Sequence, residues 1–583
     1  MPYILLFWTS VLLILFGHIK NEDLRSINNI RQAKIISLNP PKLIQAKHPF
    51  NLSFQWKAPL NLHKFNVILS SEQFSQLHLG KNFRFINNKS CFIQSGFTRN
   101  KSLSRTSQKF EFIKSPDCTL KAGTLIYSSH APSSAFEYPL TFQFFDQEDK
   151  LINTTVFQLK VAPLDDVFLN CQMIRNKKVS VHCSGLDRFG NATNDNLLVK
   201  GTLDYSDQTI DQVINKPSSF IVKNPKDFMR FHYHYKGKDY TSNALVPENF
   251  PIYFGDLHTH SFYSDARIPI SPAKLFDYAK NVSALDFMAI TDHAEGVFGE
   301  PLSTSQWQKT IQQVKSFNQN NVFSAFLGFE WTSTFLNPSS PWGHRTIIYP
   351  NYDGLPYRSD LAMYSSPKTL YKFTGDVFSY PHHSMVSWGS YDFKMGLQKS
   401  ERAFEVFSSH GSSEDMHTHI TPNSPSGSLH KAIQNTSADF SILAASDTHA
   451  GHPGLNNWHK KIHPSMLDGG GLCAVFAKEN TKKYIYQSLM ERRFYGTSGS
   501  RILLIPKDQN QPFPLTVYGS SNLHHLKVIS FDPSGHKSFQ TIPLEGLKST
   551  ITEQEVNLKN SKKFYLQIKQ KNDEMAWIGP YKN

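Results

Sequence analysis

Histidine and acidic residues repeatedly follow apolar segments in the second half of the sequence. His258 and His260 come shortly after the apolar segment Ile252–Phe254. Asp447 and His449 repeat the same i, i+2 spacing after a later apolar segment. Side chains two positions apart on an extended chain face the same side, so each pair can reach one ion. Because imidazole and carboxylate ligands suit zinc, manganese or iron, the pattern predicts a metal centre.

Six further candidate ligands lie in the same half: Asp265 follows His260 by five residues, and the other five lie beside further apolar segments. The six are Asp265, His293, Glu330, His344, His382 and His383. If these segments are parallel strands of a β/α barrel, their carboxyl ends meet at the face where such barrels build active sites. No CxxC motif occurs, so thiolate ligands are not indicated and coordination positions stay open for water and substrate. Clustered ions of this kind activate water and bind phosphoryl oxygens, which predicts metal-dependent hydrolysis.

The chain around these candidates predicts alternating strands and helices after Pro251. Ser271 can cap a helix that has Pro272 at its first position. The pattern of apolar residues predicts a strand over Phe287–Ile290 and a helix over Ser305–Phe317. Strand–helix alternation over about 250 residues predicts a parallel sheet closed into a barrel.

The motifs as a set resemble the PHP (polymerase and histidinol phosphatase) superfamily of metal-dependent phosphoesterases. The matching motifs are HTH at 258–260 with Asp265, TDH at 291–293, Glu330 after an apolar segment, His344, the pair His382 and His383, and SDTH at 446–449. Three further motifs are similar to the DUF3604 branch: FEWT at 329–332, SSHGSSE at 408–414 and FYGTSGSR at 494–501. The resemblance covers about Tyr253 to Arg501.

The resemblance implies a distorted (β/α)7-type barrel with two or three divalent metal ions. It assigns His258, His260, Glu330 and Asp447 to a first ion, Glu330, His344 and one of His382 and His383 to a second, and Asp265, His293 and His449 to a third. The family has His-Pro near the fifth motif, whereas this chain has Pro381-His382-His383, so both histidines stay open, with a preference for His382. Glu330 and Asp447 are the expected catalytic residues, together with an arginine that binds phosphate. Arg345 is the first candidate for that arginine and Arg267 the second.

The rest of the chain predicts β structure and an export signal. Residues 30–165 predict a β-sandwich-like domain, 166–247 an immunoglobulin-like β domain, 251–502 the PHP-like hydrolase domain and 503–583 a small C-terminal β domain. The short apolar run Ile4–Phe16 predicts a signal peptide within residues 1–20; an uncleaved anchor, with membrane contact, is the alternative. We therefore expect an exported protein, periplasmic or extracellular, with disulfides Cys91–Cys118 and Cys171–Cys183.

The composition is that of a globular protein, with 39% hydrophobic and 19% charged residues among 583. The net charge of +14 is not gathered into a dense Lys/Arg block. It therefore suits an anionic substrate, small or polymeric, and leaves nucleic-acid binding as a minority interpretation. The expected function is a secreted metal-dependent hydrolase of phosphoesters. Two alternatives stay open: hydrolysis of another ester or an amide, and a metal-binding module attached to a surface by its β domains.

Overall fold

The computed structural model describes the strands of residues 34–162 and most of residues 163–583. Between 34 and 163 the described residues are those of strands β1 to β10 together with 148 and 163. From 168 onward they are all residues except 176–178, 194–195, 204–208, 216–217, 223–227, 246–250, 297–299, 334–341, 416–423, 464–465 and 509. The chain divides into two compact units, residues 1–162 and 163–583. The predicted signal segment and the pair Cys91–Cys118 lie outside the described residues.

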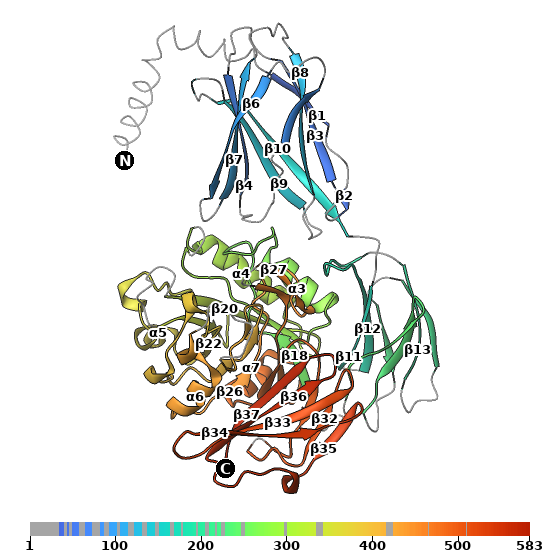
Figure 1. Ribbon diagram of the computed structural model, residues 1–583, viewed down its shortest axis with the longest axis vertical. Helices are drawn as coiled ribbons and strands as arrows, with labels where there is room; N and C mark the ends of the chain where they lie inside the picture. Colours follow the sequence, from blue (N-terminus) through green and yellow to red (C-terminus); the bar gives the residue numbers. More distant parts are fainter. Residues whose placement is uncertain are drawn as a thin grey trace, which may run out of the picture. The chain divides into compact units, whose positions relative to one another are not determined.

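The first unit consists of two mainly antiparallel sheets (Figure 1, blue to cyan). One sheet has the order β1 (Lys34–Asn39), β3 (Pro49–Lys57), β8 (Ala122–His130), β5 (Asn82–Ile86). The other has the order β2 (Ile44–Gln45), β10 (Leu151–Ala162), β9 (Glu137–Phe145), β4 (Lys64–Glu72), β7 (Arg105–Lys114), β6 (Phe92–Lys101). The buried rings of Phe54 and Phe142, one from each sheet, have centroids 4.7 Å apart. The two sheets therefore pack against each other through apolar side chains.

Two smaller sheets begin the second unit. They have the orders β11 (Phe168–Arg175), β12 (Val179–Leu186), β15 (Ser218–Val222) and β14 (Thr209–Asn215), β13 (Asn196–Leu203), β16 (Phe231–Tyr235), β17 (Lys238–Thr241). Cys171 and Cys183, opposite each other on β11 and β12, form a disulfide, which confirms that predicted pair. Cys473 is a buried free thiol.

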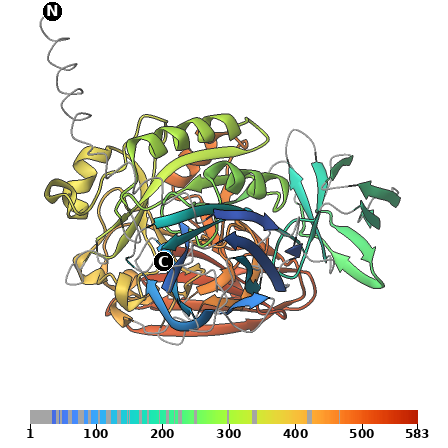
Figure 2. The ribbon, with the colours of Figure 1, turned by 90° about the horizontal axis from the view of Figure 1, so that it is seen from above.

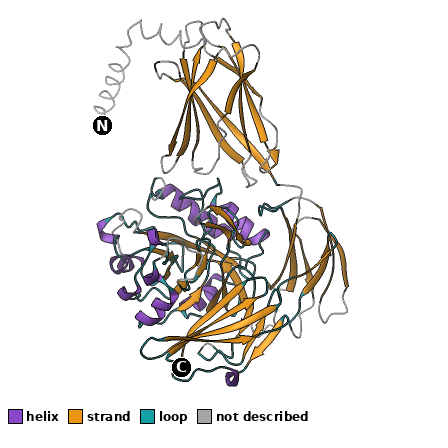
Figure 3. Ribbon diagram, viewed as in Figure 1, coloured by secondary structure: helices purple, strands orange, loops and turns teal. Residues whose placement is uncertain are grey.

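The largest sheet of the second unit is a mixed sheet of eleven strands (Figure 3). Its order is β22 (Phe378–Pro381), β21 (His344–Ile348), β20 (Ser324–Thr332), β19 (Phe287–Ile290), β18 (Ile252–Asp256), β29 (Leu472–Phe476), β30 (Phe494–Thr497), β37 (Met575–Lys582), β36 (Lys563–Gln570), β33 (Leu523–Phe531), β34 (Lys537–Pro543). Only β18, β19 and β20 run parallel to one another. Their connections are α3 (Pro272–Asn281), capped by Ser271 as predicted, and α4 (Thr304–Phe317), and these helices lie side by side (Figure 2).

Shorter elements surround this sheet. The strands are the parallel pair β23 (Ala403–Glu405) and β26 (Ser441–Leu443), and β24 (Phe407–Ser408), β25 (Gly411–Ser412), β27 (Asn456–His463), β28 (Met466–Gly469), β31 (Leu503–Ile505), β32 (Leu515–Tyr518) and β35 (Lys548–Ile551). The helices are α5 (Pro367–Thr374), α6 (Leu429–Asn435) and α7 (Lys482–Met490). The 3-10 turns are η1 (Ala362–Tyr364), η2 (Ser387–Gly389), η3 (Phe393–Met395), η4 (Pro425–Gly427) and η5 (Glu553–Glu555). None of the described helices is long and apolar enough to cross a membrane.

The predicted (β/α)7-type barrel is wrong, because the described strands form an open mixed sheet. The strand–helix alternation holds from β18 to β20 and then stops, since β21 and β22 each run antiparallel to the strand before. On the other side, β29 and β30 also pair antiparallel. Strands β33, β34, β36 and β37 extend the same sheet, so the C-terminal segment does not form the separate small β domain of the predicted fold.

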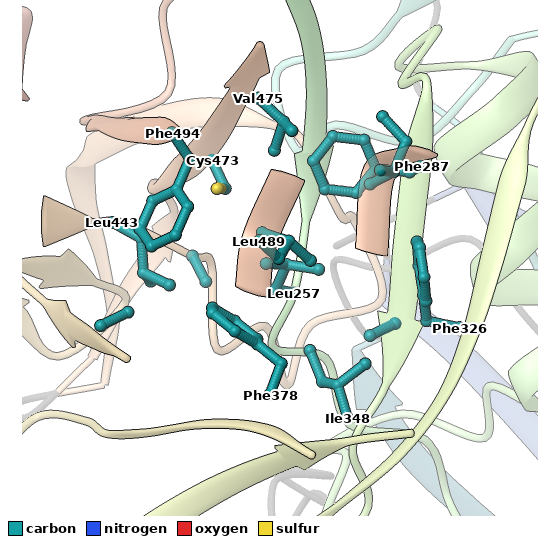
Figure 4. Close-up of a cluster of buried hydrophobic side chains, with 14 of the residues drawn as sticks. Leu257, Phe287, Phe326, Ile348, Phe378, Leu443, Cys473, Val475, Leu489 and Phe494 are labelled. Carbon is teal, nitrogen blue, oxygen red and sulfur yellow. The ribbon is translucent and has the colours of Figure 1, made fainter. Parts of the chain in front are cut away.

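A cluster of buried apolar side chains packs on one face of the sheet (Figure 4). Phe287, Phe326 and Phe378 come from β19, β20 and β22, and Leu489 comes from α7. Each fully buried side chain of this size contributes about 1.5–3 kcal/mol relative to exposure. Leu257 belongs to the same cluster, and its burial fixes the chain at the end of β18, directly before the first candidate ligand.

Candidate metal centre

The segment after β18 presents two histidines to one side. Between them, Thr259 donates its hydroxyl to the Ala289 carbonyl at 2.8 Å and its amide to Thr291 Oγ1 at 3.0 Å. Both contacts fix Thr259 against β19. Because side chains alternate along an extended chain, His258 and His260 face the opposite side, where both are fully buried.

Strands β19, β20 and β21 bring three more candidates to the same edge. His293 follows β19 and pairs through its backbone with Glu330 of β20. Because β21 is antiparallel to β20, its first residue, His344, pairs with Thr332 at the end of β20. His344 Nδ1 consequently lies 2.6 Å from Glu330 Oε1. The sequence predicts His344 just before a strand over 346–349, and in the structure His344 is the first residue of the antiparallel strand β21.

The loops after β22 and β26 supply four more residues near this edge, and Asp265, in the loop after β18, is the tenth predicted ligand. His382 and His383 follow β22, and Asp447 and His449 follow β26. The backbone of His383 has φ +31° and that of Asp447 has φ +52°. Residues other than glycine rarely adopt this region, and where they do, the strain is held by the surroundings and is frequent at functional sites.

The donor atoms of these side chains gather into overlapping groups, each within 4.8 Å. The groups are His258, His260, Glu330 and Asp447; Glu330, His344, His382 and His383; His260, Asp265, His293 and His449; and His383, His410 and Asp447. All ten residues predicted as ligands occur in the first three groups. His410, noted in the sequence only as part of the SSHGSSE motif, joins the fourth.

Glu330 lies between the first two groups. Its Oε2 is 3.1 Å from His258 Nε2 and 3.2 Å from His260 Nε2. Its Oε1 is 2.6 Å from His344 Nδ1 and 2.9 Å from His382 Nε2. Each carboxylate oxygen therefore faces a different group, which is the arrangement of a carboxylate that bridges two cations. His382, rather than His383, is the histidine within hydrogen-bond distance of this carboxylate.

Four buried nitrogen or oxygen atoms of these residues have no hydrogen-bond partner among the described residues: His260 Nε2, His344 Nε2, His383 Nδ1 and Asp447 Oδ1. Yet His260 Nε2 and Asp447 Oδ1 lie only 3.1 Å apart. Ligands at ~2.1 Å from one ion are roughly 3.0–3.4 Å apart at the corners of an octahedron or a tetrahedron. Burying polar atoms without partners is costly, so their convergence fits a divalent cation.

The charges of the centre are strongly coupled. Burial opposes ionisation of Glu330 and Asp447, but the surrounding histidines hold the pKa of both carboxyls well below its usual value. Burial likewise lowers the pKa of His258, yet Asp447 and Glu405 raise it to about 10 overall. In the metal-free chain, protonated histidine thus balances buried carboxylates, and cation binding would displace protons from the same atoms.

In three of the histidines, another side chain contacts the ring nitrogen Nδ1. These contacts join His258 Nδ1 to Glu405 Oε2 at 3.0 Å, His293 Nδ1 to Thr332 Oγ1 at 2.7 Å and His382 Nδ1 to Thr346 Oγ1 at 3.1 Å. Such contacts fix the tautomer and the ring orientation of a metal-binding histidine. In His258 and His382 they leave Nε2 directed at Glu330.

Two buried carboxylates next to the candidate ligands, Glu405 and Asp292, have roles that the sequence alone does not predict. Glu405 ends the three-residue strand β23, and nothing in its apolar context distinguishes it from an isolated strand residue. In the sequence, Asp292 is distinguished only as the middle residue of the TDH motif at 291–293. In the structure it accepts from the amide and the hydroxyl of Ser261, each at 2.7 Å, and so holds the loop of His260.

Glu405→Gln is expected to weaken metal binding about ten- to a hundredfold while the protein stays folded. The amide keeps the shape of the carboxylate but removes the charge that supports His258, as for other partners of metal-binding histidines. Competition with a chromophoric chelator measures the affinity. Asp286→Asn is the matched control. Asp286 is also a buried carboxylate, and it accepts from the amide of Phe254. It lies just before β19, at the end of that strand opposite to His293. Equal affinities of the two variants would contradict the role of Glu405.

The two candidate arginines occupy different surroundings. Arg345 donates through Nε to Glu401 Oε1 at 2.5 Å and lies over the ring of Tyr391, fully buried. Arg267 lies in the loop after Asp265, and its buried Nη1 has no hydrogen-bond partner among the described residues. Burial lowers the pKa of Arg267 to about 10, against the opposing effect of Asp265 and Asp447. Arg345 Nη2 is buried without a partner as well. The Arg345 guanidinium is, however, already bound by Glu401 and by the backbone carbonyls of Trp342 and His344. For contact with a substrate the structure therefore favours Arg267.

Other features lie apart from the groups. Glu414 accepts from Tyr565 and Gln567, which links its loop to β36. The second HxH pair, His417 and His419, lies outside the described residues. A cavity of 490 Å³ lined by Phe440, Phe476 and Phe494, among others, includes none of the candidate ligands. It opens at the start of β26, the end opposite to Asp447, so the candidate centre is defined by its side chains and not by this cavity.

Comparison with known families bears on part of this region. Residues 297–400 and 387–505 match the model of DUF3604, a family described as a protein of unknown function. The resemblance to DUF3604 is confirmed over these residues. The DUF3604 match contains Glu330, His344 and the four residues that follow β22 and β26. The histidines after β18 and β19 precede it, and membership of the PHP superfamily stays a prediction.

Individual proteins similar to this chain add little about its role. An uncharacterized protein of Chlamydia pneumoniae is 21% identical over 369 residues, which cover 58% of this chain and 56% of that protein. The chain thus spans little more than half of that relative. A solved structure of a DUF4466 family protein from Parabacteroides merdae is 10% identical and covers 36% of this chain and 95% of that one, with a TM-score of 0.16. A TM-score this low supports no conclusion about fold or function.

Proposed function

We propose that the region of residues 251–502 is a metal-dependent hydrolase that acts on phosphoesters with two or three divalent ions, zinc, manganese or iron. The observation that carries the proposal is the position of Glu330, whose two carboxylate oxygens face two different groups of histidines. When bound, clustered divalent ions lower the pKa of water and stabilise charge on substrate oxygens. A second carboxylate, Asp447, lies 3.1 Å from His260 and 3.3 Å from His410.

The chain's own residues contribute orientation and charge. Glu405 and the threonines beside His293 and His382 hold imidazoles in fixed directions, which limits reorganisation when substrate arrives. Arg267 supplies a cationic guanidinium beside Asp265 and Asp447 with a donor that is not used within the described chain. A guanidinium can bind two oxygens of one phosphoryl group. That feature and the net charge of +14 support an anionic phosphoester over an uncharged ester or amide.

Export is part of the proposal. The disulfide Cys171–Cys183 supports an oxidising compartment, because such bonds are rare in the cytosol. We propose a periplasmic or extracellular enzyme without specific nucleic-acid binding. Fractionation of cells that make the full-length chain checks this, and recovery of the protein only from the cytoplasm, with both thiols reduced, would overturn it.

Metal content and substrate range test the proposed function together. The purified full chain is incubated with zinc, manganese or iron(II), freed of unbound metal and examined by elemental analysis. We expect two or three ions per chain and turnover in a screen of phosphomonoesters, phosphodiesters, carboxylic esters and amides. Less than one ion per chain would contradict the metal centre. A loaded protein that cleaves carboxylic esters or amides but no phosphoester would contradict the substrate class alone.

A further inference from the structure

An exposed tryptophan lies beside the candidate metal centre. Trp388, in the turn η2, is 39% exposed. Its ring centroid lies 4.9 Å from that of His383, 5.1 Å from that of His410 and 5.7 Å from that of His344. A single exposed apolar side chain is common on protein surfaces, and what distinguishes Trp388 is that its ring contacts three buried histidines of the candidate centre. Among the exposed large aromatic side chains of the described chain, this ring is the one in contact with candidate ligands.

The turn that carries Trp388 is held tightly. A Cβ atom on Gly389 would lie 2.8 Å from Cε1 and 2.9 Å from Nδ1 of His383, so the backbone touches that ring. Gly343, with φ +60°, packs equally closely, since a Cβ there would lie 2.8 Å from the Gly389 carbonyl oxygen. The amide of Gly389 donates to the Val386 carbonyl at 2.9 Å. The backbone that carries the indole is therefore closely packed, which limits the conformational entropy lost when a ligand binds against it.

The histidine beneath the indole is itself under constraint. His383 has φ +31°, and its Nδ1 is buried without a hydrogen-bond partner among the described residues. His382, its neighbour, already faces Glu330 at 2.9 Å. The strain at His383 thus places an imidazole with an unused polar atom between the metal groups and Trp388.

We propose that Trp388, with His383 and His410, forms a stacking subsite for a planar aromatic ring of the substrate. The inference rests on the proposed function and narrows it to phosphoesters that carry such a ring, with nucleotides as the favoured chemistry. Stacking of a base on an aromatic side chain is worth about 1–3 kcal/mol, roughly 5- to 150-fold in affinity. The phosphoryl group would then lie toward Arg267 and the metal groups, and the ring toward Trp388.

Two phosphomonoesters that differ only by the base separate stacking from phosphate binding. The probes are adenosine 5′-monophosphate and ribose 5-phosphate, with the metal-loaded full chain. In Trp388→Ala, kcat/KM for the nucleotide is expected to fall at least tenfold more than kcat/KM for the sugar phosphate. Trp388→Phe should restore most of the difference, because phenylalanine retains a stacking face. Equal losses for both substrates, or no loss for either, would overturn the subsite.

A binding measurement keeps the inference independent of activity. Calorimetric titration with adenosine, which has no phosphate, should give an affinity at least fivefold weaker in Trp388→Ala than in the unaltered chain at equal metal content. Phe373→Ala is the matched control, since Phe373 is 45% exposed and contacts Tyr357 and Tyr364. If adenosine binds all three proteins alike, the subsite is rejected even when phosphoesters are cleaved. If adenosine binding depends on Trp388 but no phosphoester is cleaved, the failure lies with the proposed function.

Discussion

Glu330→Gln should lose at least about a hundredfold in kcat/KM and bind fewer metal ions, while the protein stays folded. The substitution keeps the shape of the side chain but removes the charge that faces His258 and His260 through one oxygen and His344 and His382 through the other. Both groups are expected to weaken together, because an amide is a poor bridge between cations. A hundredfold loss corresponds to about 2.7 kcal/mol of transition-state stabilisation.

Elemental analysis and kinetics on the same preparations check this expectation. Asp286→Asn again serves as the control, because it removes an equally buried carboxylate charge away from the groups. His417→Ala, at the HxH pair that the sequence places in a Ser/Pro-rich stretch, should keep near-normal activity. Glu330→Gln with the metal content and turnover of these controls would show that the assignment of the centre is wrong.

Arg267→Met should lower kcat/KM for a phosphoester by about a hundredfold and leave the metal content unchanged. The substitution removes a guanidinium whose Nη1 is unpartnered in the described chain, and Arg267 is not itself a member of the ligand groups. Loss of one donor to developing charge typically costs about 10²–10³ in rate. Arg267→Lys should recover only part of the loss, since an ammonium cannot bind two phosphoryl oxygens in the same fork.

The pattern across variants distinguishes the role of Arg267 from that of Glu330. Metal content falls in Glu330→Gln and stays constant in Arg267→Met, whereas kcat/KM falls in both. Arg345→Met provides the comparison for the other candidate arginine: it breaks the buried pair with Glu401 and should lower the unfolding temperature. A phosphoester activity that survives Arg267→Met but is lost in folded, metal-loaded Arg345→Met would reverse the assignment.

How far the sequence predicts this molecule depends on the range of the interactions involved. The helix from Pro272 and the strand at Phe287–Ile290 are set by local periodicity and capping, and both occur as predicted. The closed barrel was wrong because strand direction after β20 depends on partners far along the chain. His344 illustrates the difference. It pairs with Thr332 because β21 runs antiparallel to β20, and the sequence between these strands has no helical pattern that would indicate their relative direction.

The grouping of candidate ligands was easier to predict than the fold. Residue type and position after apolar segments suffice to bring His258 and Asp447 to one edge, whether the sheet is closed or open. Their supporting contacts were not predictable in this way. Glu405 reaches His258 across 147 positions of sequence, and a single acidic residue in an apolar strand carries no periodic signal. The sequence likewise does not predict a role for Trp388, because that role depends on its contacts with the rings of His383 and His410.

The place of β37 beside β30 has a consequence for how the protein is made. The sheet that carries the candidate ligands has the last described strand, Met575–Lys582, near its middle, between β30 and β36. During synthesis, β18 to β30 therefore leave the ribosome with the edge of β30 unpaired until the final strand follows. Pairing partners so distant along the chain also make folding slow. Export before folding would suit such a chain, because the sheet could then assemble once all of its strands are present.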